Sequence, residues 1–134
     1  MPRRRLRTLR YLWAAPVSLL GLCLALPACL PRGHMRWHDG VLEVSGSAAA
    51  SILGRLPGVG PVAAITLGHV VIGRTPQALD AVRPHERVHV SQTERWGPLF
   101  LLAYPLASLW VWRRGGHPYR DNPFEIAARR SAGF

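Results

Sequence analysis

The stretch His85-Glu86-Arg87-Val88-His89 has the spacing H-E-x-x-H. On an α-helix, positions i and i+4 lie on one face about one turn apart, so two imidazoles at this spacing can converge on one tetrahedral metal ion. A carboxylate directly after the first histidine can reach a water on that metal and act as a general base. The pattern therefore predicts a helix with His85 and His89 as zinc ligands and Glu86 as the catalytic base. A surface helix that carries two solvated histidines is the alternative interpretation.

Proline and glycine set the expected ends of this helix. Proline is tolerated only near a helix start, so we expect the helix to begin near Arg83-Pro84. The pair Gly97-Pro98 is typical of a helix end. The motif should therefore lie in the first turns of a helix of moderate length.

A zinc site of this class also needs a third protein ligand and an open position for water. Glu94 is too close to His89 in the same helix, and Glu125 is the better candidate. Asn122 is a good N-cap and Pro123 a good first helical residue, so Glu125 falls at the third position of a second helix. At that position Glu125 can also close a capping box with Asn122, and the two roles are not exclusive.

Upstream of the motif the sequence predicts strands. Residues 63–73 are apolar and β-branched, bounded by Pro61 and Gly73, and are expected to form one strand. Residues 37–46 contain an Asp-Gly turn followed by alternating residues, which indicates a partner strand. Residues 54–61 are a turn-rich connector. We interpret the remaining histidines as packed or exposed residues and not as ligands: His34, His38, His69 and His117.

The first 30 residues have the pattern of a membrane segment. Five arginines lie within the first ten residues, and residues 11–30 carry no charge, which is enough to cross roughly 30 Å of hydrocarbon as a helix. The basic flank predicts a cytoplasmic N-terminus and an extracytoplasmic remainder. A retained transmembrane or signal anchor in the cell membrane is favoured over a cleaved signal peptide or a lipoprotein leader. We therefore expect an anchor at residues 1–30 and one small domain at residues 31–134.

A second apolar stretch covers residues 98–112 and is short for a full span. If it crossed the membrane, Glu125 would lie on the opposite side from His85 and His89 and could not share their metal. The zinc hypothesis therefore predicts a buried or interfacial helix here, and Trp110 and Trp112 beside two arginines suit an interface. A plain two-span membrane protein is the competing interpretation.

The formal net charge of +10 comes from 17 arginines without any lysine. Beyond the first ten residues the arginines are scattered, and no basic stripe is interleaved with aromatic residues. Nucleic-acid binding is therefore not expected, and contact with anionic lipid headgroups is the simpler use of the charge. Both cysteines, Cys23 and Cys29, lie in the leading apolar segment, so the domain has no thiolate ligands.

Three runs of sequence together resemble a family of small, uncharacterised bacterial membrane proteins of the zincin type, and also a minimal gluzincin metallopeptidase. These runs are residues 85–92, 94–100 and 119–125. The resemblance implies an α+β, zincin-like domain in which zinc is held by His85, His89 and Glu125, with Glu86 as base. It also implies that a strand before the motif helix borders the cleft and pairs with a peptide substrate.

The function expected from these observations is that of a membrane-associated zinc metallopeptidase. Tyr119 or His117 could stabilise the oxyanion in such an enzyme, since both lie near Glu125 in the sequence. The alternatives are a catalytically inactive, membrane-anchored structural or interaction protein with the same fold, and the two-span membrane protein.

Overall fold

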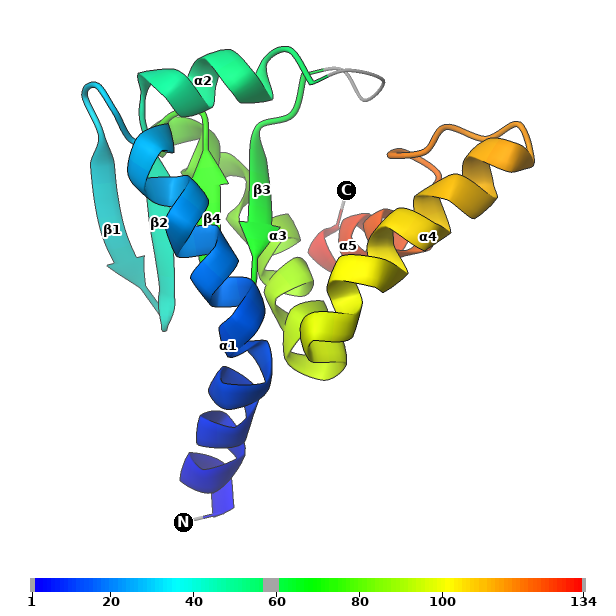
Figure 1. Cartoon of the computed structure of the whole chain (residues 1–134), viewed down its shortest axis with the longest axis horizontal. Helices are drawn as coiled ribbons and strands as arrows, with labels where there is room; N and C mark the ends of the chain where they lie inside the picture. The colour runs from blue at the N-terminus through cyan, green and yellow to red at the C-terminus, as the bar shows by residue number, and fades with distance from the viewer. Residues whose placement is uncertain (1, 57–60, 134) are drawn as a thin grey trace.

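The computed structural model describes residues 2–56 and 61–133, and the chain has an α+β fold. A long apolar helix comes first, a four-stranded mixed sheet follows, and further helices complete the chain (Figure 1). Part of the turn-rich connector, residues 57–60, lies outside the described residues. The elements are α1 (Pro2–Ala28), β1 (His34–His38), β2 (Val41–Ser45), α2 (Ser47–Leu53), β3 (Ala64–Leu67), β4 (Val70–Gly73), α3 (Pro76–Trp96), the 3₁₀ turn η1 (Gly97–Leu99), α4 (Phe100–Arg113) and α5 (Pro123–Ala132).

The strand order in the sheet is β1-β2-β4-β3, which places β3 at one edge. The expected turn at Asp39-Gly40 joins β1 and β2 as an antiparallel pair, and both turn residues have positive φ. The expectation of a single strand at residues 63–73 is wrong, because these residues form the antiparallel hairpin β3–β4. Gly68 has a φ of 65°, a left-handed conformation that glycine adopts without steric cost, and it reverses the chain in the middle of the apolar run.

The two faces of the sheet are covered by different helices, as the alternation of side chains along each strand requires. One face packs against α1 and α2, and the other packs against α3 (Figure 1). The first core contains Ala25, Val44, Ala49, Leu53, Val62, Val70 and Ile72. The second contains Val41, Ala64, Val71, Leu79 and Val90.

Helix α1 is both the candidate membrane span and a packed part of the fold. Its segment Arg3–Ala28 is long and apolar enough to cross a membrane, the one such helix among the described residues. Its inward side nevertheless makes specific contacts. The Ser18 hydroxyl accepts a hydrogen bond from the backbone N–H of His69 at 3.0 Å, and the Trp13 indole donates to the Arg95 carbonyl at 3.2 Å. The backbone of Gly21 lies against Leu67 and Val70.

Helix α3 begins earlier than the position of Pro84 predicts. The predicted start near Arg83-Pro84 is wrong, because Thr75 caps the helix with its hydroxyl accepting from Ala78 N–H at 3.0 Å, and Pro76 occupies the first turn. Pro84 is therefore inside the helix, where it lacks the N–H that would bond one turn back. The predicted end is confirmed: Gly97, with a φ of 59°, is the C-cap.

The segment at residues 98–112 is a helix, α4, and it is not buried. Only Phe100 and Val111 in α4 are buried, and most of its leucine and tryptophan side chains face outward. Its 14 residues span about 21 Å, shorter than a bilayer core. Helix α4 projects away from the sheet layers, and the chain then turns back so that α5 lies beside α3 (Figure 1). That return brings Glu125 to the motif helix.

Candidate metal centre

The structure brings His85, His89 and Glu125 together. The two histidines lie one turn apart on α3, and Glu125 projects from the first turn of α5. Glu125 Oε2 is 3.0 Å from His85 Nε2 and 3.1 Å from His89 Nε2, and the two Nε2 atoms are 3.2 Å apart. All three side chains are largely shielded from solvent.

This arrangement fits a zinc ion in its donor set and in its spacing. Two imidazole nitrogens and one carboxylate oxygen form a typical catalytic zinc set. Ligand atoms bound at about 2.0–2.1 Å in a tetrahedron lie roughly 3.3 Å from one another, close to the separations found here. Hydrogen bonding alone explains the group less well, because two imidazole nitrogens face each other and also face the same carboxylate oxygen.

A glutamine fixes the orientation of one of the two histidine rings. Gln92 Nε2 donates to the Phe124 carbonyl at 3.0 Å, so its amide oxygen points to His89 Nδ1 at 2.8 Å. A carbonyl oxygen only accepts, so Nδ1 of His89 carries a proton, and in the neutral ring Nε2 has the lone pair that a metal would need. The same bridge links α3 to α5. Gln92 lies three residues after His89, and that helical spacing was the signal in the sequence that could have identified it.

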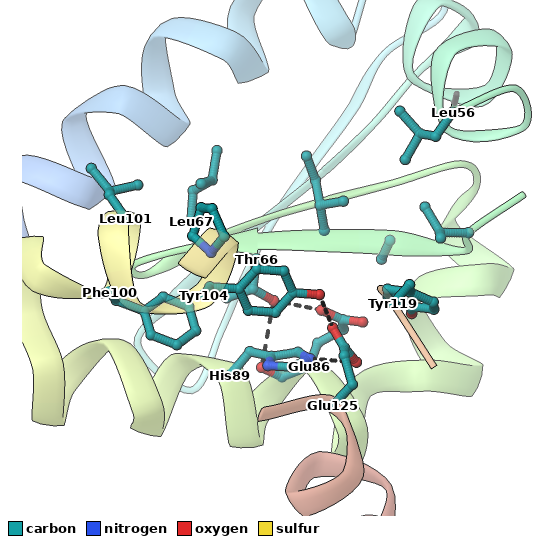
Figure 2. Close-up of a pocket in the computed structure, with 14 residues that line it drawn as sticks. Leu56, Thr66, Leu67, Glu86, His89, Phe100, Leu101, Tyr104, Tyr119 and Glu125 are labelled. Atoms are coloured by element: carbon teal, nitrogen blue, oxygen red, sulfur yellow. Dashed lines mark hydrogen bonds and ion pairs between the residues drawn. The ribbon is translucent and has the colours of Figure 1, made fainter. Parts of the chain in front are cut away.

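Glu125 is held as an ionised carboxylate. The Tyr104 hydroxyl donates to Glu125 Oε1 at 2.7 Å (Figure 2), which leaves Oε2 directed at His85 and His89. Burial raises the pKa of Glu125, but hydrogen bonds from His85, His89 and Tyr104 outweigh it and bring the pKa to about 2. The capping-box alternative is not formed, because Asn122 N–H donates to the Tyr119 carbonyl while the Asn122 side chain caps Phe124 N–H as predicted.

Glu86 lies on the sheet side of α3 and is also buried. The hydroxyl of Thr66 in β3 donates to Glu86 Oε2 at 2.6 Å (Figure 2). Burial raises the pKa of Glu86, and the neighbouring histidines and the Thr66 hydrogen bond only partly oppose that rise. A raised pKa makes the Glu86 carboxylate a stronger base than an exposed glutamate and suits it to take up a proton.

A cavity of about 340 Å³ lies over these residues, between the edge strand β3 and helix α4. Glu86, His89 and Glu125 form its polar floor (Figure 2). Its walls are mainly apolar and include Ile65, Leu67, Phe100, Leu101, Tyr104 and Tyr119. A small apolar cavity with a few convergent polar groups is typical of a ligand site.

The other candidates from the sequence lie at different distances from this centre. Tyr119 lines the cavity, and burial together with the charges of Glu125 and Glu86 raises its pKa to about 12, so it remains a neutral donor. His117 instead supports its own loop, since its Nδ1 accepts from the backbone N–H groups of Tyr119 and Arg120. His69 packs against Tyr11 of α1, away from the group formed by His85, His89 and Glu125.

Comparison of the chain with protein-family models, with curated proteins and with solved structures finds no match.

Proposed function

We propose that this protein is a membrane-associated, zinc-dependent metallopeptidase with a zincin-like site. The observation that carries the proposal is the convergence of Nε2 of His85, Nε2 of His89 and Oε2 of Glu125, with separations of 3.0 to 3.2 Å. Glu86 lies beside this group on the same cavity floor. A metal group with a general base beside it explains why three ionisable groups, two of them buried, converge on one point while a fourth faces the cavity next to them.

Each residue of the site has a separate role in the proposed hydrolysis. Zinc bound by His85, His89 and Glu125 would supply Lewis-acid polarisation of a carbonyl and a water of lowered pKa. Glu86 accepts a proton from the attacking water and passes it to the leaving amine, and its raised pKa suits both transfers. The neutral phenol of Tyr119 faces the cavity and can donate a hydrogen bond to the oxygen of the scissile carbonyl.

The edge strand supports a peptide as the substrate. Strand β3 is terminal in the sheet, pairs with β4 on one side and borders the cavity with its other side. An extended peptide added along that side would gain main-chain hydrogen bonds, while one of its apolar side chains fills the cavity. Thr66 belongs to the same strand, so substrate and general base would be aligned by one element.

Helix α1 supports placement at the cell membrane. We propose that α1 anchors the chain at the cell membrane through its outward apolar side, with the arginine-rich N-terminus toward the cytoplasm, while its inward side keeps its contacts with the sheet and α3. Helix α4 is too short to return the chain across the membrane, so His85, His89 and Glu125 stay on one side.

The test begins with the zinc content of the detergent-purified full-length chain. One zinc per chain is expected in the parent, and His85→Ala and Glu125→Ala should lose it. His34→Ala is the matched control, because His34 is an exposed histidine of β1 outside the metal group. A parent without zinc after reconstitution would overturn the proposal.

Catalysis is tested separately with Glu86→Gln, which preserves the shape of the side chain but not its basicity. We expect this variant to keep its zinc and to lose peptide hydrolysis by about 10²- to 10⁴-fold, the usual contribution of a general base. Hydrolysis of a peptide library, read by mass spectrometry, measures the activity. Zinc in both proteins with no hydrolysis by the parent would favour a structural or interaction protein instead.

A further inference from the structure

The outward face of α4 is apolar along its whole length. Side chains that are 43% to 64% exposed follow one another on this outer face, which consists of Leu102, Leu106, Leu109, Trp110 and Trp112. The first charged residue of the helix is Arg113, at its last position. A helix on the surface of a soluble protein presents polar residues to water, so this face is arranged for a different environment.

The inward face of the same helix is fully used by the metal centre. Phe100 packs on Phe124, Tyr104 holds Glu125, and Ser108 accepts a hydrogen bond from Asn122 Nδ2 at 2.7 Å. Rotation of α4 to hide its leucines would break these contacts. The apolar outer face is therefore a fixed feature of the folded site.

Charge and aromatic residues at the end of α4 indicate what covers that face. Arg113 and Arg114 follow the two tryptophans, and the Arg114 guanidinium lies 4.4 Å from the centre of the Trp110 ring. Tryptophan and arginine together are typical of the headgroup region of a membrane with anionic lipids. A protein partner would not require tryptophans followed by arginines at the end of the helix, whereas a lipid surface matches both the leucines and these charges.

The start of α4 continues the surface of the candidate membrane helix. The turn η1 that precedes α4 packs against α1, where the Trp13 indole lies against Gly97 and donates to the Arg95 carbonyl. Helix α1 also turns exposed leucines outward, among them Leu12, Leu19 and Leu20. The exposed apolar surfaces of α1 and α4 thus both extend from the region where η1 packs against α1.

We propose that α4 is an interfacial helix whose outer face inserts into an anionic bilayer, so that the cavity of the metal centre opens at the membrane surface. Leu101 and Pro105 connect the two features, because both line the cavity and both are exposed next to Leu102 and Leu106. Together with the proposed function, on which this part rests, the placement specifies the substrate: a peptide segment that lies on the bilayer or emerges from it.

Spin labels on the full-length chain in nanodiscs of phosphatidylcholine and phosphatidylglycerol test the placement of α4. Both native cysteines are replaced by serine, and a nitroxide is attached to Leu106→Cys or, as a water-facing control on α3, to Gln77→Cys. We expect the label at position 106 to collide more with oxygen than with a soluble nickel chelate, and the label at position 77 to show the reverse. Equal behaviour at the two positions, or a label at 106 shielded from both reagents as in a protein contact, would overturn the proposal.

The substrate class is tested with one peptide in two forms, soluble and tethered to the nanodisc by an acyl chain. The parent should cleave the tethered form preferentially, and Leu102→Glu/Leu106→Glu should reduce that preference by roughly tenfold or more while cleavage of the soluble form is unchanged. Equal cleavage of the two forms by the parent would overturn the substrate class. The zinc content of the same samples separates the outcomes, because a chain without zinc contradicts the proposed function and leaves the spin-label result to decide the placement of α4.

Discussion

Replacing Tyr104 by phenylalanine removes one hydroxyl and tests whether α4 positions a metal ligand. That hydroxyl donates to Glu125 Oε1 at 2.7 Å, and Glu125 is only 4% exposed, so water cannot easily replace the lost partner. A hydrogen bond to a charged group contributes about 1.5–3 kcal/mol. If the carboxylate is ordered for zinc by this bond, the loss corresponds to a zinc affinity lower by roughly ten- to a hundredfold, the range found for residues that orient metal ligands.

The affinity is measured by competition with a chromogenic zinc chelator, using the full-length chain in detergent. Tyr119→Phe is the matched control, because Tyr119 lines the same cavity and, within the described part of the chain, donates no hydrogen bond to Glu125. The absorption spectrum of the cobalt-substituted protein should shift in Tyr104→Phe, which a purely structural role for the hydroxyl would not cause. Unchanged affinity and an unchanged spectrum in a variant that unfolds like the parent would refute the reasoning.

Three further changes test other parts of the structure. Thr66→Val removes the 2.6 Å hydrogen bond to Glu86 and should lower kcat about tenfold with zinc content unchanged, as read by hydrolysis and metal assays. Gly21→Ala should destabilise the chain by about 1–3 kcal/mol in thermal unfolding, because the new Cβ would lie 2.9 Å from the Leu67 carbonyl oxygen, whereas a freestanding helix would gain stability. Glu43→Gln should cost about 3 kcal/mol at neutral pH. Burial raises the pKa of Glu43, but two arginines hold it below its usual range, so the difference from the parent should shrink as denaturation is measured at pH values below about 4.3.

The parts of the site that follow local rules were predictable from the sequence. The i,i+4 spacing placed His85 and His89 on one helix face, and the Asn-Pro pair at positions 122 and 123 correctly predicted the start of α5. Both signals act within one turn of helix, and no tertiary contact is needed to interpret them.

The errors arose where distant contacts override a local rule. Pro84 predicted a helix start, but the helix is capped by Thr75, about two turns before the expected start, and the packing of Leu79 on the sheet keeps these earlier turns helical. The run at residues 63–73 read as one strand because a single glycine inside it was not recognised as a turn. At these positions the packing of the sheet on α3 contributes more to the observed structure than local conformational propensity does.

Tyr104 was not predicted at all, since it lies in the middle of an apolar segment that was interpreted by its hydropathy alone. Its partner Glu125 is 21 residues further along the chain, and only the fold of α4 against α5 brings the two together. A lone tyrosine in an apolar helix is a weak signal, although a buried hydroxyl does require a partner. Tyr104 is thus harder to find from sequence than His85 and His89, because no short spacing connects it to Glu125.

Asn122 shows why the candidate metal centre depends on α4 as well as on the motif helix. The side chain of Asn122 is fully buried, and its oxygen caps α5 while its Nδ2 donates to the Tyr104 carbonyl at 3.1 Å and to the Ser108 hydroxyl at 2.7 Å. One residue therefore fixes both the start of the helix that carries Glu125 and the helix that holds Glu125 in place. If α4 crossed the membrane, the two bonds from Asn122 Nδ2 to α4 and the convergence of Glu125 on His85 and His89 would be lost together. The three side chains can therefore converge only if α4 does not cross a membrane.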